Sequence, residues 1–220
     1  MKKMYFAVNL VAGRSTINKK LGIILDKFTK ANYEVTVHTT LSAKDTEKAA
    51  IYACENEYDI LVCAGGDGTL SLCLQGLMKC KKRIPIGYIP SGSTNDFARS
   101  LGIPKNPLLA ADFIINGKPI SCDVGELNGD FFSYIAAFGA FTDITYETSQ
   151  KAKNVLGHAA YVLNGITKMT NIRAKHMKIE YDGNIIEDDF LYGMVTNTKS
   201  VAGIFTINNL LLDDGLFEVT

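Results

Sequence analysis

In the first half of the chain, segments with the hydrophobic pattern of a strand alternate with segments that have the hydrophobic pattern of a helix. Apolar runs of strand length at Met4–Leu10, Ile60–Ala64 and Ile84–Ile89 predict buried strands, and Tyr33–Thr39 alternates valine with polar residues. After the strands at residues 4–10, 33–39 and 60–64, apolar residues recur at helical spacing. The expected helices run from Ile17 to Ala31, from an N-cap at Ser42, and from Thr69 to about Cys80. Strands that alternate with helices predict a mainly parallel sheet with helices on both faces.

The pattern changes near Cys122, where short alternating segments begin to flank turn sequences. Asn128-Gly129 and Asp182-Gly183-Asn184 predict two β-hairpins, and one helix is expected between them at about residues 155–169. We therefore predict an α/β domain over residues 1–122 and an antiparallel, β-rich domain over residues 123–220. Because the chain stops at 216–220 within a strand pattern, the second domain is expected to be incomplete.

Composition and charge narrow the class of protein. The 220 residues carry 23 Lys and Arg against 23 Asp and Glu, so the chain has no net positive charge that would favour binding to nucleic acid. The five cysteines include no Cys-x-x-Cys pair and lie mostly in apolar segments, which argues against disulfides or a zinc site and for the cytoplasm. No apolar run approaches the roughly 18 residues of a membrane span. We expect a soluble protein with ample core for one or two domains.

The string Gly65-Gly66-Asp67-Gly68-Thr69 follows a predicted buried strand and is the strongest candidate for chemistry. Open α/β sheets bind ligands at the carboxyl ends of their strands. Glycines let the backbone approach a ligand and expose N–H groups to phosphate oxygens, and a helix beginning at Thr69 favours an anion. A carboxylate beside a phosphate calls for a cation such as Mg²⁺, or for a hydroxyl that it orients. The alternative is a tight turn without function.

Three further segments are expected near the same edge. The loop 9–14 follows the first strand, although an ordinary strand-to-helix turn would explain it as well. It carries Asn9, Gly13 and Arg14. The decapeptide Pro90–Arg99 is dense in small hydrogen-bonding side chains before a helix start. Asp123 lies at the domain junction, where it either faces the cleft or caps a turn.

Several common motifs are absent from the sequence. It contains no Gly-x-x-x-x-Gly-Lys-Ser/Thr phosphate loop, no Gly-x-Gly-x-x-Gly fingerprint and no Gly-x-Ser-x-Gly elbow. The combination that is present is the glycine string at 65–69 followed by Pro90-x-Gly92-Ser93-x-Asn95-Asp96-Phe97-Ala98. This combination resembles the catalytic domain of the diacylglycerol kinase and bacterial lipid kinase family, over residues 4 to 220. NAD kinases and phosphofructokinases share the first motif, whereas the second discriminates against NAD kinases.

The resemblance implies which residues bind ATP and Mg²⁺. In that family the first-strand loop and the glycine turn bind ATP, and the loop 93–95 faces the phosphates. Thr40 matches a nucleotide-contacting threonine after the second strand, with Thr39 as the alternative. With the loop residues above, the nucleotide-binding candidates are Asn9, Gly13, Arg14, Thr40, Gly65, Gly66, Asp67, Gly68, Thr69, Gly92, Ser93, Thr94 and Asn95. Asp67 and Asp123 match acidic positions tied to catalysis and to Mg²⁺.

The sequence departs from the family pattern at three places. Leu10 replaces the usual proline, which predicts a less rigid first loop. A second, structural Mg²⁺ site falls on Asp214 and the carbonyl of Leu216, but its other side-chain ligand is replaced by Leu211. The family's Gly-Glu motif, which supplies the general base, does not occur, and Glu218 is a poor substitute. The ATP side of the site is thus expected to be intact and the base to be missing.

A basic segment between Gln150 and Lys178 has no acidic residue. Such a segment either rests on anionic lipid headgroups or forms a solvated helix face. Its basic residues are Lys151, Lys153, Lys168, Arg173, Lys175 and Lys178.

The sequence therefore favours a cytoplasmic kinase that uses ATP and Mg²⁺ to phosphorylate a lipid hydroxyl, such as that of diacylglycerol. Its expected partner is a lipid at a membrane surface, with peripheral attachment and a homodimer left open. The rivals are a nucleotide-binding fragment or regulator without catalysis, and a soluble-metabolite kinase of the NAD kinase type. Asp67→Asn is expected to abolish phosphoryl transfer. The fold should stay intact, because Asp67 is expected in a surface turn and the change removes a charge without adding volume.

Overall fold

A computed structural model of the chain describes residues 1–10, 16–139, 174–201, 205–206 and 210–220. These residues form two compact units. The first combines Met1–Tyr134 with Asn197–Gly215, and the second combines Ile135–Thr196 with Leu216–Thr220. This division differs from the boundary expected near residue 122. The chain leaves the first unit only after Tyr134, and it returns to that unit at Asn197.

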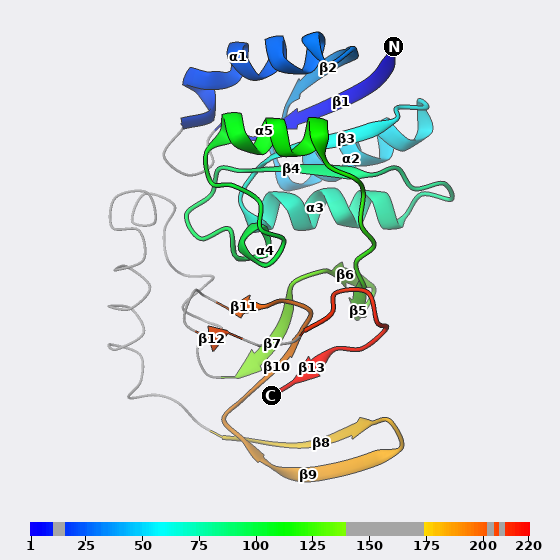
Figure 1. The fold of residues 1–220 in the computed structure, drawn as a ribbon. Helices are drawn as coiled ribbons and strands as arrows, with labels where there is room; N and C mark the ends of the chain where they lie inside the picture. Colours follow the sequence, from blue (N-terminus) through cyan, green and yellow to red (C-terminus); the bar gives the residue numbers. More distant parts are fainter. Residues whose placement is uncertain (11–15, 140–173, 202–204, 207–209) are drawn as a thin grey trace. The chain divides into compact units, whose positions relative to one another are not determined.

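The first unit is built on a four-stranded parallel sheet in the order β2-β1-β3-β4 (Figure 1). Its strands are β1 (Lys2–Val8), β2 (Tyr33–Thr39), β3 (Ile60–Gly65) and β4 (Ile86–Pro90). The helices are α1 (Thr16–Lys30), α2 (Ala43–Glu55), α3 (Asp67–Met78), α4 (Asp96–Ser100) and α5 (Pro107–Asn116). The predicted alternation of strand and helix is confirmed. Ser42 is the N-cap of α2, and its side chain accepts a hydrogen bond from the N–H of Asp45.

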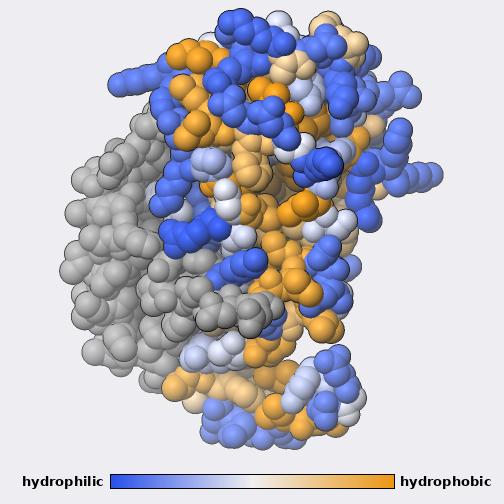
Figure 2. Space-filling view, in the orientation of Figure 1, coloured by the Kyte–Doolittle hydropathy of each residue, from blue (hydrophilic) through white to orange (hydrophobic). Residues whose placement is uncertain are grey.

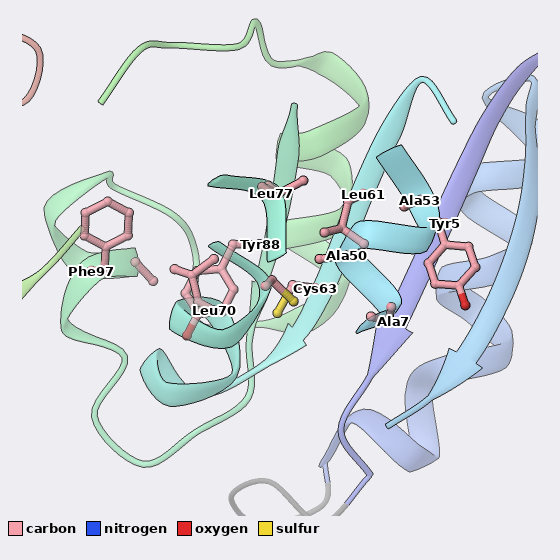
Figure 3. Close-up of a cluster of buried hydrophobic side chains, with 13 residues drawn as sticks. Tyr5, Ala7, Ala50, Ala53, Leu61, Cys63, Leu70, Leu77, Tyr88 and Phe97 are labelled. Carbon is pink, nitrogen blue, oxygen red and sulfur yellow. The ribbon is translucent and has the colours of Figure 1, made fainter. Parts of the chain in front are cut away.

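Helices cover both faces of this sheet, as the sequence predicts. Successive side chains of a strand point to opposite faces. Met4 and Phe6 of β1 pack in a cluster with α1 and α5. Tyr5 and Ala7 pack in the other cluster, with α2, α3 and Phe97 of α4. Figure 3 shows this second cluster, with Phe97, Leu70 and Tyr88 at one end and Tyr5 at the other.

Helices α2 and α3 approach each other closely at Gly76. A Cβ atom at this position would lie 2.4 Å from the carbonyl oxygen of Glu47 and 2.7 Å from the Cβ of Ala50. A side chain on Gly76 would therefore push the two helices apart.

A hairpin of β5 (Gly125–Leu127) and β6 (Asp130–Phe132) completes the first stretch of this unit. Its turn residues Asn128 and Gly129 have φ values of 54° and 89°, the left-handed pair that Asn-Gly favours. The Gln75 side chain of α3 donates to the carbonyl of Phe131 at 2.6 Å and accepts its N–H at 3.0 Å. These bonds attach the hairpin to α3. In the returning stretch, β11 (Ser200–Val201) pairs with β12 (Phe205–Thr206).

The second unit contains antiparallel strands, as expected. β7 (Ile135–Gly139), β10 (Tyr192–Thr196) and β13 (Glu218–Val219) form a sheet in the order β13-β10-β7. β8 (Lys175–Tyr181) and β9 (Asn184–Phe190) form the second predicted hairpin, with positive φ at Asp182 and Gly183. Hydrophobic and hydrophilic side chains mix on this hairpin (Figure 2). Ile185 in β9 is 60% exposed. The expected helix at 155–169 lies outside the described residues. Of the basic segment, only Lys175 and Lys178 are described, and both are exposed in β8.

Candidate active site

Backbone hydrogen bonds continue past the strand ends and align four loops at the carboxyl edge of the parallel sheet. The bonds run from Asn9 N to Ala64 O at 2.9 Å, from Thr40 N to Val8 O at 2.9 Å, and from Ser91 N to Gly65 O at 2.8 Å. The segments that begin at Asn9, Thr40, Gly66 and Ser91 therefore share one edge, where open α/β sheets bind ligands. Gly13 and Arg14, predicted for the same site, lie outside the described residues.

Packing within the protein requires glycine at Gly65 and Gly92, and a Cβ on Gly66 would lie 3.2 Å from the Cα of Gly92. A Cβ on Gly92 would lie 2.5 Å from the Cα of Gly66, and one on Gly65 would lie 2.4 Å from the Thr69 side chain. The loops after β3 and β4 thus touch backbone to backbone. Gly68 differs, because it is exposed and an added Cβ would meet no heavy atom within 4 Å in the part of the chain that the structure describes. Of the glycines at 65, 66, 68 and 92, Gly68 is the one whose surroundings leave room for a side chain.

Helix α3 begins at Asp67, rather than at Thr69 as expected. Gly66 is its extended N-cap, and the N–H groups of Thr69 and Leu70 both donate to the Gly66 carbonyl, at 2.9 and 3.1 Å. The N–H groups of Asp67 and Gly68 precede these bonds and find no acceptor within the helix. They are thus positioned to bind an anion.

The Asp67 carboxylate joins the glycine turn to α4. Its Oδ2 accepts the N–H of Asp96 at 3.1 Å, and its Oδ1 accepts the N–H of Phe97 at 3.3 Å. Burial raises the pKa of Asp67 above its ordinary value of 3.8, although the N–H groups of Asp96 and Phe97 oppose the shift. The expectation that Asp67 lies in a surface turn is wrong. It is a half-buried helical residue that holds a second loop in place.

The loop that follows β4 divides into an exposed part and a buried part. Ser93 is exposed and Thr94 is half-buried, so both remain candidates for ligand contact. Asn95 is buried in the left-handed conformation, with φ at 54°. Its Oδ1 accepts from the N–H of Gly92 at 3.0 Å and from the Tyr88 hydroxyl at 3.2 Å, and its Nδ2 donates to the Gly92 carbonyl at 2.8 Å. The Asn95 side chain therefore shapes the loop from inside.

Asp96 is a buried carboxylate to which the sequence analysis assigned no role. It is 2% exposed, and its Oδ2 accepts the hydroxyl of Tyr134 at 2.9 Å. Its Oδ1 lies 3.7 Å from Nη1 of Arg99 and accepts no hydrogen bond from the described residues. Asp96 belongs to the motif at 90–99, but its hydrogen bond with Tyr134 joins residues far apart in the sequence, which a local sequence pattern cannot predict.

Asp123 is held by the returning stretch of the chain. Its N–H donates to the carbonyl of Leu212 at 2.6 Å, and its Oδ2 accepts the N–H of Gly215 at 2.7 Å. The described residues contain no group of three or more His, Cys, Asp or Glu placed to hold a metal ion. The Mg²⁺ sites predicted at Asp67 with Asp123, and at Asp214 with Leu216, stay predictions.

Asn9 and Thr40 occupy the edge as predicted. The Nδ2 of Asn9 donates to the Thr69 hydroxyl at 3.3 Å, which links the first loop to the start of α3. Thr40 is 7% exposed.

Comparison with known proteins identifies the family. The diacylglycerol kinase catalytic domain matches residues 3–127. The chain belongs to this family. The diacylglycerol kinase of Bacillus subtilis (strain 168) is 39% identical to it over 221 residues, which cover 100% of this chain and 73% of the relative. That of Staphylococcus aureus (strain JH9) is 35% identical over 219 residues, covering 99% of this chain and 70% of the relative.

Solved structures of the diacylglycerol kinase family share the fold. A crystal structure of a diacylglycerol kinase from Bacillus anthracis str. Sterne has a TM-score of 0.81 and 30% sequence identity, and the match covers 99% of this chain and 72% of that one. The predicted fold class is therefore confirmed. No helix within the described segments is both long and apolar enough to cross a membrane.

Proposed function

We propose that this diacylglycerol kinase family member transfers the γ-phosphoryl group of ATP to a lipid hydroxyl such as that of diacylglycerol. The observation that carries the proposal is the close packing of the two motif loops, from the Gly66–Gly92 contact to the bonds between Asp67 and α4. This packing brings the start of α3 next to the loop that carries the exposed Ser93. Family membership supports a lipid kinase as the activity.

The phosphates of the nucleotide would be held by groups from both loops. The N–H groups of Asp67 and Gly68 at the start of α3 suit phosphate oxygens. The hydroxyls of Ser93 and Thr94 are placed on the neighbouring loop as further donors. Such fixed donors stabilise charge that develops during phosphoryl transfer.

The carboxylates of this edge fit Mg²⁺ as the accompanying ion. Mg²⁺ binds oxygen and is usually held by one or two carboxylates together with substrate phosphates, so a cluster of three acidic residues is not required. The two oxygens of Asp67 accept the N–H groups of Asp96 and Phe97, and the buried Oδ1 of Asp96 adds an oxygen that accepts no hydrogen bond from the described residues. Asp67 and Asp123 would hold the ion, which when bound neutralises phosphate charge.

Two measurements test the proposal. Calorimetric titration of the chain with Mg·ATP should show binding that weakens when Ser93 is changed to alanine, with Ser71→Ala as the control on α3. Transfer of radiolabel from ATP should then be measured with diacylglycerol in mixed micelles and, in parallel, with NAD as acceptor. No heat at millimolar Mg·ATP would refute nucleotide binding. Binding without transfer would favour a regulator, and transfer to NAD would favour a metabolite kinase.

A further inference from the structure

We propose that the segment Asn197–Lys199, of which Asn197 and Thr198 are buried, is a positioning element that holds α4 and the Asp123 loop in one fixed arrangement. The effect of this segment on catalysis rests on the proposed function. The segment enters the first unit where the chain returns from the second. Asn197 and Thr198 are both 0% exposed, although both are polar. Buried polar groups destabilise a fold unless they are hydrogen-bonded, so their bonds indicate what they do.

Asn197 bonds to three residues of the first unit that lie apart in the sequence, Asp123, Tyr134 and Leu212. Its Nδ2 donates to the carbonyls of Asp123 and Leu212, both at 3.1 Å. Its backbone N–H donates to the carbonyl of Tyr134 at 3.1 Å. Both protons of the Nδ2 amide are thus directed at backbone carbonyls, that of Asp123 and that of Leu212, which also accepts the N–H of Asp123. No aliphatic side chain of similar size would make these bonds.

Thr198 and Lys199 attach the segment to α4 through Ser100. The hydroxyls of Ser100 and Thr198 lie 2.5 Å apart, and the N–H of Lys199 donates to Ser100 Oγ at 3.1 Å. Ser100 Oγ also lies 3.2 Å from the Asp96 carbonyl, to which it donates. A hydroxyl has one proton and two lone pairs, so Ser100 donates to Asp96 and accepts from both Thr198 and Lys199.

These bonds close a continuous path between the two carboxylates proposed to hold Mg²⁺. Asp67 accepts the N–H of Asp96, Asp96 accepts the hydroxyl of Tyr134, and the Tyr134 carbonyl accepts the N–H of Asn197. Asn197 then donates to the Asp123 carbonyl. Because these bonds form one connected chain and its members are buried or half-buried, the network is expected to favour a single arrangement of both carboxylates.

Thr198→Val tests the positioning role, because it removes a hydroxyl at nearly constant volume. Thr46→Val is the matched control. Thr46 is also a buried threonine, 3% exposed, and its hydroxyl donates to the Ser42 carbonyl at 3.0 Å in α2. Both variants lose the hydrogen bond of a buried threonine hydroxyl and should lower the urea midpoint of unfolding to a similar extent.

Two further readouts separate positioning from simple stabilisation. In Thr198→Val, exchange of the Asp96 and Phe97 amide protons should accelerate roughly tenfold, as expected for the loss of one buried hydrogen bond near α4. In Thr46→Val, exchange of these two amide protons should accelerate by no more than the loss of overall stability explains. Transfer to diacylglycerol should fall about tenfold in kcat for Thr198→Val, with KM for ATP changed much less. Ser100→Ala should reproduce both effects, and adding Thr198→Val to it should contribute little more.

The two hypotheses fail in distinguishable ways. If amide exchange at Asp96 and Phe97 in Thr198→Val matches that in Thr46→Val, the positioning role is refuted, whatever the kinase assay shows. If exchange accelerates as expected but the wild-type chain binds no Mg·ATP, the coupling within the site stands and the proposed function fails. Equal kcat for Thr198→Val and Thr46→Val in an active protein would also overturn the positioning role.

Discussion

Gly68→Ala separates the needs of the fold from those of a ligand. Gly68 is an exposed residue in the first turn of α3, and a Cβ there would meet no heavy atom of the described residues within 4 Å. Its φ is not positive, so alanine adopts the same backbone conformation. Glycine within a helix is destabilising by roughly 0.5–1 kcal/mol relative to alanine. The variant should therefore unfold at the same urea concentration as the wild type or a higher one.

Nucleotide binding should respond in the opposite direction. A phosphate held by the N–H groups of Asp67 and Gly68 approaches the backbone at the place where the new methyl group would project. We expect the affinity for Mg·ATP to fall at least tenfold, which corresponds to about 1.4 kcal/mol. Gly22→Ala is the matched control, since Gly22 is an exposed glycine within α1 and its added Cβ also meets nothing within 4 Å.

Circular dichroism during urea unfolding and calorimetric titration with Mg·ATP measure both effects. Gly22→Ala should raise stability and leave the affinity unchanged. If Gly68→Ala binds Mg·ATP as tightly as the control does, no phosphate approaches Gly68 and the binding mode proposed here is wrong. If Gly68→Ala instead destabilises the protein, the first turn of α3 carries a constraint that its open surroundings do not show.

Two further substitutions probe packing and charge. Gly76→Ala should lower the free energy of unfolding by about 1–3 kcal/mol, because its Cβ would lie 2.4 Å from the Glu47 carbonyl oxygen; a loss no larger than the experimental error in urea unfolding would contradict the close helix contact. Burial raises the pKa of Asp67 above 3.8, so the folded state holds this proton more tightly than the unfolded chain does. The contribution of Asp67 to stability is therefore greatest below pH 3.8 and falls as the pH rises through the folded-state pKa. The unfolding free energy of the wild type minus that of Asp67→Asn should decrease across this range in urea titrations at several pH values, and a constant difference would argue against a raised pKa.

The sequence predicts the fold well where the signal is local. The strand and helix periods of the first half, the N-cap at Ser42 and the turns at Asn128-Gly129 and Asp182-Gly183 all depend on neighbouring residues, and all are confirmed. Position at a sheet edge also follows from local pattern, because parallel strands end on the same side. The loops at Asn9 and Gly66 were placed there correctly.

The parts that were missed depend on contacts between distant residues. Gly92 resembles a ligand-binding glycine in sequence, yet the backbone of Gly66 is what requires it. Asp67 resembles a surface turn residue until its N–H donors on α4 are seen. Asn197 carries no local signal, because its bonding partners lie in stretches that only the folded chain brings together. A periodicity argument does not reach such contacts.

The return of residues 197–215 to the first unit has a consequence for the order in which the chain folds. The parallel sheet and its helices lie within residues 1–134, so they are complete in sequence once those residues leave the ribosome. Asn197 and Leu212, which bond to Asp123, are synthesised only after β7, β8, β9 and β10 of the second unit. At about 5–20 residues per second, the roughly 80 residues that remain require several seconds or more. The nascent sheet therefore spends that interval with the partners of Asp123 still unmade, and the edge that carries the proposed chemistry is the last part of the first unit to take its final form.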